Sequence, residues 1–329
     1  MTDALMKAQA HLTDRDHVLL DWLYDHGVLT TPQIAHALYP SLDFAQKRLT
    51  KLVALAVIDR FRPQRPVGGS YPFHYVLDQL GTDIVLTQRP DEEPPRRGQA
   101  RARRWSLTNR TNLPHLLGVN GFFTDLAGHA RTHPGSALER WWSTSQTIGP
   151  GRFRDTPGVS TYSYLPVRPD GHGIWTEHDH QVAFWLEYDT GTESLTTLTE
   201  KVTTYSTRLT GGFGGLRSWP LLFTFHSSGR QLHFHQRLAH QHPRVPVAST
   251  ARDPHTRQSP AEDIWWLHNS RGRHRLADLP DAVAAQSPNA RPDLWPEPPR
   301  PPLTQDRSAG GVSGDAWDDS DPGDGDSGW

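Results

Sequence analysis

The 329-residue sequence predicts an α+β/α/β chain in three parts: three helices with a two-stranded ribbon, an α/β domain, and a disordered acidic C-terminal tail. Apolar residues recur at helical spacing in the first part, whereas the second contains short apolar runs typical of strands. Beyond residue 280 the chain is rich in Pro, Gly and Asp and has little to bury. We therefore expect a domain at 10–87, a basic Pro-rich linker at 88–104, an α/β domain at 105–280 and a disordered tail at 281–329.

Capping signals predict the three N-terminal helices. Thr13, followed three residues later by Asp16, precedes DRDHVLLDWLYDH, and Gly27 ends that helix. Thr31 and Pro32 suit the start of the next helix, TTPQIAHAL. A third helix is expected near residue 41, in DFAQKRLTKLVALA. Its apolar side is expected to contain Phe44, Leu49, Leu52 and Leu55.

The two-stranded ribbon is predicted by VIDRF and HYVLD, which flank a loop rich in Pro and Gly. Three helices followed by such a ribbon is the order of a winged helix-turn-helix, whose third helix enters the major groove of DNA. Basic residues occur on both the third helix and the ribbon. The side chains expected to contact double-stranded DNA are Lys47, Arg48, Lys51, Arg60, Arg62 and Arg65. A solvated helix face, or a winged helix that binds protein, is the alternative interpretation.

The second domain alternates between helical and strand-like segments. We expect helices in LPHLLGVNGFFTDLAGHA and in TESLTTLTEKVTTYSTRL, where Thr192 can cap. Strands are expected in ERWWSTSQT, VSTYSYLPVRPDG, QVAFWLEYDTG, SWPLLFTFH and VPVAST. This pattern predicts a sheet flanked by helices.

Acidic residues fall at the ends of two of these strands. Asp170 is expected to end one strand, and Glu187 lies near the end of the next. Because side chains alternate along a strand, Glu187 and Asp189 should point to the same face. Lys201, about two turns into the following helix, could reach back to them. Carboxylates on neighbouring strand ends can hold Mg²⁺, so Asp170 and Glu187 are the candidate metal ligands, and Asp170, Glu187, Asp189 and Lys201 the candidate catalytic group.

Simpler interpretations exist for several of these residues. Asp170 could be a turn residue before Gly171, and Glu193 a favourable charge in the first turn of a helix. A zinc site is the less favoured interpretation of the histidines in GHGIWTEHDHQ, which we expect in an exposed hairpin: His172, His178 and His180. His233 and His235 alternate with apolar residues and are expected to be structural. A tyrosine nucleophile ranks below metal-assisted hydrolysis, since no tyrosine has distinctive surroundings.

Composition limits the class of protein. The chain has no cysteine, which excludes disulfides and thiolate metal sites. No apolar run reaches the roughly 18 residues needed to span a bilayer, so we expect a soluble cytoplasmic protein without a membrane partner. The net charge is −2, but residues 306–329 contain seven Asp and one Arg, which leaves about +4 on the rest. The body is therefore mildly basic, and the acidic tail is a candidate site for a protein partner.

Two resemblances add to these observations. PDG followed by a strand ending in LEYD resembles the restriction-endonuclease-like superfamily with its PD-(D/E)XK pattern. Asp189 stands where that pattern has lysine, and Lys201 on the neighbouring helix is the candidate replacement. Seven segments in order resemble the actinobacterial replication-relaxation family: LTDRDHVLLDWLYDHGVLTTPQIAHALYP, KRLTKLVALAVIDRF, HYVLDQLGTDIV, HLLGVNGFF, RPDG, FWLEYDTGTE and EKVTTY.

The resemblance implies a DNA-binding protein of plasmid or mobile-element replication or transfer, with a winged helix joined to a restriction-endonuclease-like α/β domain. It implies a metal-dependent nicking activity, with Mg²⁺ held by Asp170 and Glu187 and with Lys201 near the phosphate or the attacking water. One alternative is a non-catalytic DNA-binding accessory factor on a decayed nuclease scaffold. Another is a transcriptional regulator whose second domain recognises a partner protein.

Overall fold

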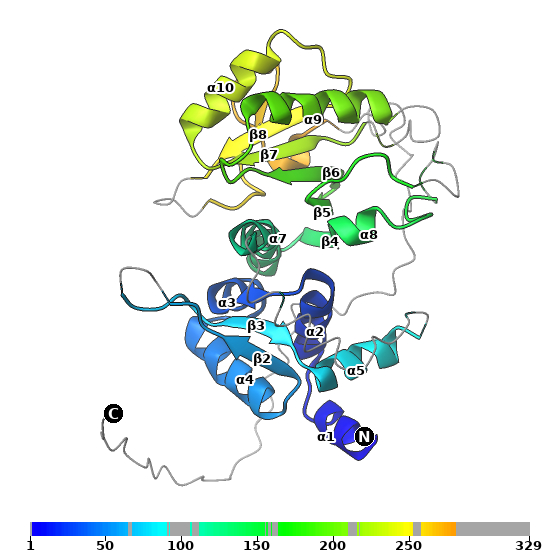
Figure 1. The fold of residues 1–329 in the computed structure, drawn as a ribbon, viewed down its shortest axis with the longest axis vertical. Coiled ribbons are helices and arrows are strands. Elements are labelled where there is room, and N and C mark those ends of the chain that lie inside the picture. Colours follow the sequence, from blue (N-terminus) through cyan, green and yellow to red (C-terminus); the bar gives the residue numbers. More distant parts are fainter. Residues whose placement is uncertain are drawn as a thin grey trace.

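The computed structural model describes residues 2–64, 68–90, 92, 106, 112–154, 156, 159, 164–209, 216, 218–252 and 258–280. The predicted tail at 281–329 and most of the predicted linker at 88–104 lie outside these residues. The described residues form helices together with two sheets, which confirms a mixed α and β chain (Figure 1).

The N-terminal half combines helices with a small antiparallel sheet. Its elements are α1 (Thr2–Gln9), α2 (Asp14–His26), β1 (Leu29–Thr30), α3 (Thr31–Leu38), α4 (Leu42–Ala54), β2 (Ile58–Phe61), β3 (His74–Leu77) and α5 (Gln79–Gln88). The capping boxes at Thr13 and Thr30 and the Ser41 cap begin α2, α3 and α4, close to the predicted positions. The sheet order is β1-β3-β2, so the β2–β3 hairpin is bound on its β3 side by the short β1.

The second half is built on a mixed sheet in the order β4-β5-β6-β7-β8-β9. Its elements are α7 (Leu113–Thr132), β4 (Ser136–Ser143), α8 (Thr144–Thr147), β5 (Gly171–Glu177), β6 (His180–Tyr188), α9 (Leu195–Arg208), β7 (Leu221–Phe225), α10 (Ser228–Leu238), β8 (Val247–Ala251), β9 (Trp266–Leu267) and the 3-10 helix η2 (Leu276–Asp278). Strands β4, β5 and β6 pair antiparallel, β7 and β8 continue parallel to β6, and β9 returns antiparallel.

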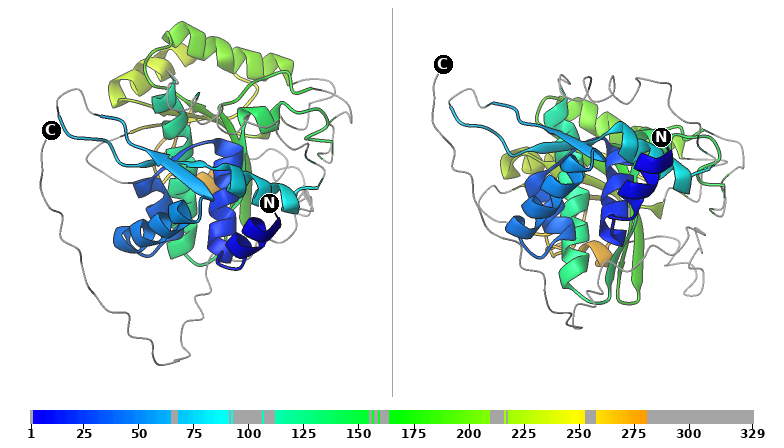
Figure 2. Two further views of the ribbon diagram at one scale, coloured as in Figure 1. Left: turned by 60° about the horizontal axis from the view of Figure 1, so that its bottom comes forward. Right: turned by 90° about the horizontal axis from the view of Figure 1, so that it is seen from below.

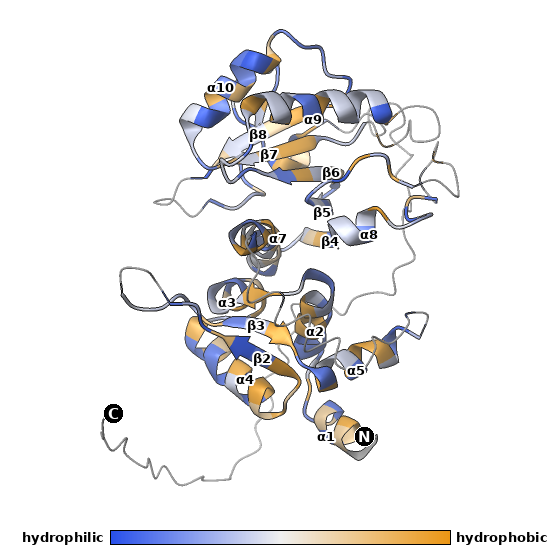
Figure 3. Cartoon of the chain, in the orientation of Figure 1, coloured by the Kyte–Doolittle hydropathy of each residue, from blue (hydrophilic) through white to orange (hydrophobic). Residues whose placement is uncertain are grey.

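Both faces of this sheet are buried. Phe184 and Leu186 of β6 pack on the side of α7, whereas Trp185 between them packs on the side of α9 and α10. This alternation follows the period of two along a strand. A central strand that is covered on both faces has to be apolar almost throughout. Strand β7 is an example: Figure 3 shows it as hydrophobic, in contrast to the largely hydrophilic helix α10.

Helix α7 lies between the sheet and the N-terminal half. A Cβ at Gly128 would lie 2.3 Å from the His36 ring of α3, and one at Gly118 would lie 2.1 Å from the Tyr188 ring of β6. Glycine inside a helix costs about 1 kcal/mol relative to alanine. These glycines therefore serve close approach, because any side chain would push α3 or β6 away from α7.

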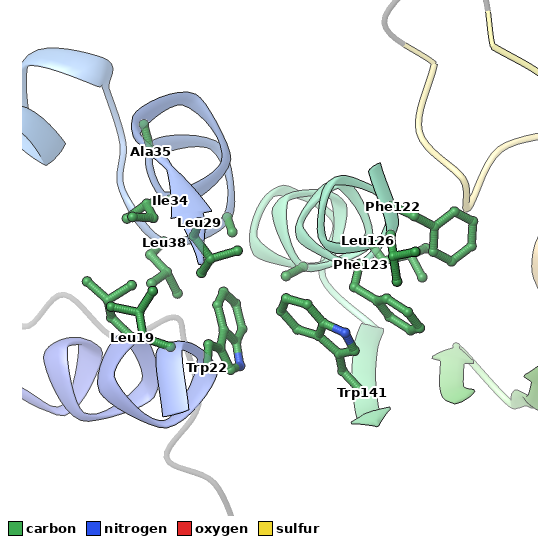
Figure 4. Packing of buried hydrophobic residues seen from close by; sticks show 14 of the residues in the cluster. Leu19, Trp22, Leu29, Ile34, Ala35, Leu38, Phe122, Phe123, Leu126 and Trp141 are labelled. Carbon is green, nitrogen blue, oxygen red and sulfur yellow. The ribbon is translucent and has the colours of Figure 1, made fainter. Parts of the chain in front are cut away.

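One hydrophobic cluster continues from the N-terminal helices through α7 to the sheet. Figure 4 shows Trp22 and Trp141 side by side where the two halves meet. The division of the chain into separate domains stays a prediction, since the described parts of both share this cluster. None of the described helices is long and apolar enough to cross a membrane.

Several local expectations were wrong. Residues 164–169, directly before Asp170, form no strand, so Asp170 precedes β5 instead of ending a strand. The segment 171–177 is a strand that forms the predicted hairpin with β6, but it is largely buried, and the exposed part of the hairpin is its turn at residues 178–180. Phe44 was expected on the apolar side of α4 but is 51% exposed, because the buried side of this helix consists of Ala45, Leu49 and Leu52.

Candidate functional site

The candidate site lies where β5 begins and β6 ends. Gly171 pairs with Leu186 across the two antiparallel strands, so the preceding Asp170 is next to Glu187. The backbone N–H of Asp170 donates to the Leu186 carbonyl at 2.9 Å, which extends the ladder to this point. The two carboxylates are therefore adjacent, with Asp170 before the start of β5 and Glu187 near the end of β6.

Glu187 is almost fully buried, with 2% of the residue exposed. Lys201 Nζ of α9 donates to its Oε2 at 2.9 Å, and the Tyr205 hydroxyl, one turn further along α9, donates to its Oε1 at 2.9 Å. Burial, reinforced by the nearby Asp170 carboxylate, nevertheless raises the pKa of Glu187 to about 7. The Glu187 carboxyl group therefore gains or loses its proton near neutral pH.

Lys201 bridges two carboxylates. Its Nζ lies 2.9 Å from Glu187 Oε2 and 2.9 Å from Glu193 Oε2, and 32% of its side chain stays exposed. Burial alone would lower the pKa of Lys201, but the two carboxylates outweigh it and raise the pKa. Glu193 was expected in the first turn of α9; it precedes the helix, because Ser194 and not Thr192 is the cap.

Asp170 is held by groups from two other elements. Its Oδ2 accepts the Tyr188 backbone N–H at 2.8 Å and lies 3.1 Å from His115 Nε2, in the first turn of α7. The hydrogen bond to Asp170 raises the pKa of His115. His115 was missed by the sequence analysis, although a histidine inside an apolar helical run is a usable signal. Tyr205 was not singled out by its sequence surroundings, although it lies four residues after Lys201.

Asp189 is separated from this group by its own partners. Arg230 of α10 binds it in a bidentate manner, with Nε–Oδ2 at 2.6 Å and Nη2–Oδ1 at 2.9 Å. Arg252 donates to the Asp189 carbonyl at 2.6 Å and stacks over the Tyr188 ring. Asp189 therefore fastens the carboxyl end of β6 to α10 and to the end of β8. The sequence did not indicate these arginines, because both lie at least 40 residues away.

The predicted DNA-contacting side chains divide into two groups. Lys47 and Lys51 of α4 and Arg60 and Arg62 at the β2–β3 hairpin are exposed. Arg48 differs from the expectation that it projects with Lys47 and Lys51. It turns inward to the buried Asp16, with Nε–Oδ1 at 3.0 Å, and its Nη2 also bonds the His11 carbonyl.

At the hairpin, the guanidinium groups of Arg60 and Arg62 lie 4.2 and 4.8 Å from the centre of the Phe73 ring. This stacking holds both cations on the same side of the hairpin. Arg65, the sixth predicted contact, lies outside the described residues.

The histidines separate by burial. His172 is fully buried, where it stacks on Trp219 and its Nδ1 lies 2.9 Å from the Phe184 carbonyl, so the expectation of a surface histidine was wrong for it. His178 and His180 are exposed at the β5–β6 turn, the opposite end of the strands. Among the described residues, no group of three or more His, Asp or Glu side chains is arranged to hold a metal ion.

We predict a pH-dependent stability from His235, which lies on α10. Its Nε2 is 2.6 Å from Ser249 Oγ, and burial lowers its pKa to about 4. The neutral ring therefore contributes stability that is complete above pH 6.5 and is lost as the pH falls toward 4, by about 3 kcal/mol in total. In urea unfolding, the stability difference between the parent protein and His235→Gln should shrink over this interval. Exposed His180→Gln is the control; a constant difference for His235→Gln would contradict the prediction.

The sequence model of the replication-relaxation family matches residues 20–213. The chain belongs to this family. The match runs from α2 into the segment after α9, so it includes the small sheet, α7, β5 and β6, together with Asp170 and Glu187. Neither the curated proteins nor the solved structures contain a match to this replication-relaxation protein. Membership indicates a role in the replication or relaxation of plasmid or mobile-element DNA.

Proposed function

We propose that this replication-relaxation protein binds duplex DNA through a winged helix formed by the N-terminal half. The supporting observation is the order helix, strand, two helices and hairpin, with β1 completing the sheet beside β3. In such a unit the third helix, here α4, enters the major groove, and the hairpin contacts the backbone. Lys47, with 76% of its side chain exposed, and Lys51 lie on α4 and supply positive charge to that helix.

The second half is proposed to be an endonuclease-like domain. Its order is α7, three antiparallel strands, α9 and the parallel strand β7. Together with the PDG and LEYD segments, this order supports the resemblance to the PD-(D/E)XK superfamily. The strand ends of that domain are where its carboxylates would meet a scissile phosphate.

A single observation carries the proposal that this site nicks DNA. Asp170 and Glu187 are neighbours across β5 and β6, and Lys201 contacts Glu187 from α9. Lysine at this place compensates for the Asp189 that occupies the usual lysine position. The site thus combines two carboxylates with a cation that is partly exposed to an incoming phosphate.

The donor set fits a hard divalent cation. Mg²⁺ is typically bound through one or two carboxylates and keeps several waters, so Asp170 and Glu187 would suffice to hold it. When bound, the cation would activate water and neutralise charge on the phosphate. Burial is the main cause of the raised pKa of Glu187 and the Asp170 carboxylate adds to it; a divalent cation between the two carboxylates would relieve their repulsion.

The chain's own groups have separate tasks in this proposal. His115 and the Tyr188 N–H orient Asp170, while Tyr205 holds Glu187. Lys201 is placed to bind a phosphate oxygen and to stabilise developing negative charge. The Asp189–Arg230 pair keeps the end of β6 in position.

A second candidate is a non-catalytic DNA-binding accessory factor. The observation that favours it is that both Glu187 oxygens already accept hydrogen bonds from Lys201 and Tyr205. A lysine that neutralises the carboxylate can replace a metal as its partner. In that case the α/β half would serve as a scaffold.

Incubation with supercoiled plasmid and Mg²⁺ separates the two candidates. We expect conversion to open circles by the parent protein and a loss of at least about 100-fold in Glu187→Gln and Asp170→Asn. Exposed Glu200→Gln on α9 is the matched carboxylate control and should retain the parent rate.

Plasmid binding is measured on the same samples, and EDTA should abolish nicking without abolishing binding. If the proteins bind the plasmid and none of them, including the parent protein, nicks it, the protein is an accessory factor. Nicking that is unchanged in Glu187→Gln would contradict the assignment of this site as the nicking site.

A further inference from the structure

The first turns of α7 connect the β2–β3 hairpin to the carboxylate site. On one side, Val76 of the hairpin and the nearby Val28 pack with Phe61, Leu113, Leu116 and Leu117. On the other side, His115 of the same turn lies 3.1 Å from Asp170 Oδ2. The base of the hairpin and the carboxylate site therefore contact opposite sides of the same helix end.

Hydrogen bonds hold this connection in one position. Gln33 Nε2 of α3 donates to the Leu117 carbonyl at 2.7 Å, and Asn120 Nδ2 of α7 donates to the Val28 carbonyl at 2.7 Å. The Tyr188 ring occupies the space left by Gly118 on the opposite side of α7. Buried polar bonds with this directionality, together with ring packing, leave little freedom for one half to move against the other.

Helix width sets the separation between the two surfaces. An α-helix with its side chains is roughly 10–12 Å across. One turn of B-DNA extends over about 34–36 Å. A duplex lying along the hairpin therefore comes within reach of the carboxylate site before it completes one turn.

Basic side chains lie on both sides of α7. Arg60 and Arg62 are exposed at the β2–β3 hairpin. Both strands of this hairpin extend away from the body of the molecule in Figure 2. Beyond α7, Lys201, Arg230 and Arg252 surround the ends of β6, β7 and β8. Each of these cations belongs to the described part of the chain, and each is near a strand end or a hairpin strand.

We infer that the β2–β3 hairpin and the carboxylate site form one DNA-binding surface, which contacts a single duplex at two places less than one helical turn apart. The inference rests on the proposed DNA binding, but it does not require nicking. It implies that the distance along the DNA between the hairpin contact and the contact made by the α/β half is fixed.

Because the chain has no cysteine, introduced thiols are unique attachment points. The test uses the double variant Gln64→Cys/Thr192→Cys, which places one thiol on the hairpin and one beside the carboxylate site, both at exposed positions. Each thiol carries an iron chelate that cleaves nearby DNA. The protein is bound to a uniformly labelled duplex of mixed sequence, and complexes with one protein per duplex are isolated before cleavage.

We expect two cuts per duplex and an internal fragment of one narrow length class, below about 10 base pairs, wherever the protein binds. The control Gln64→Cys/His180→Cys carries its second thiol at the far end of the strands and should yield only the hairpin cut. Cuts from position 64 alone, or internal fragments of widely varying length, would overturn the single surface while leaving DNA binding intact. Failure of the parent protein to bind the duplex would overturn both proposals.

Discussion

Replacing Trp141 with alanine is expected to destabilise the protein by about 3–5 kcal/mol. Trp141 of β4 is 3% exposed and stacks on His26 of α2 at 3.7 Å between ring centres. Its other neighbours are Trp22 at 5.3 Å and Phe123 at 5.2 Å. One side chain thus fills the space between α2, α7 and the large sheet, and alanine would leave a cavity that none of these elements can close alone.

Urea unfolding followed by circular dichroism measures this effect. We expect one cooperative transition in the parent protein, because the hydrophobic cluster is continuous across both halves, and a lower midpoint in Trp141→Ala. Phe44→Ala is the matched aromatic control, since Phe44 is 51% exposed, and it should change stability by less than about 0.5 kcal/mol. Equal effects of the two substitutions would show that Trp141 does not join the halves.

Replacing Arg48 with methionine is expected to cost about 3–5 kcal/mol, because it leaves the Asp16 carboxylate buried without its cation. The Asp16 side chain is only 1% exposed, and it also accepts bonds from the Thr13 N–H and hydroxyl at 2.7 Å. Burial would raise the pKa of Asp16, but the bonds from Arg48 and Thr13 outweigh it and lower the pKa. The pair therefore fastens the N-terminus of α2 to α4.

Lys47→Met provides the neighbouring control. Lys47 pairs with the exposed Asp43 in the same helix, so its loss should change the free energy of unfolding by less than about 1 kcal/mol. DNA affinity should respond in the opposite order, with Lys47→Met weakening binding more than Arg48→Met at a temperature where both are folded. A thermally neutral Arg48→Met that weakens DNA binding would return Arg48 to the DNA-contacting group.

The elements themselves were largely predictable because their signals are local. The capping residue and the third residue of each capping box lie within one turn, as at Thr13 and Asp16. Alternation along β6 accounts for the placement of Phe184 and Leu186 on the opposite face from Trp185, because a strand has only two faces. The family was also recognisable from ordered segments, and the match over residues 20–213 confirms it.

Side-chain partners were less predictable. The partner of Arg48 lies 32 residues away, and that of Asp189 lies 41 residues away, so no helical or strand period relates them. His172 looked polar in the sequence but is covered by Trp185 and Trp219 from other segments. Asp170 and Glu187 lie side by side because Gly171 pairs with Leu186, so Asp170 comes just before β5 and not at the end of a strand as predicted.

The amino-acid sequence by itself determined where the principal helices and strands form and which family the chain belongs to. The tertiary structure alone decided that Arg48 supports α2 instead of facing solvent, that Asp189 binds Arg230, and that the first turns of α7 contact both the base of the β2–β3 hairpin and Asp170. The physical reason is range: helix caps and strand alternation act over a few residues, whereas buried ion pairs and helix packing depend on groups that meet only when the chain has folded.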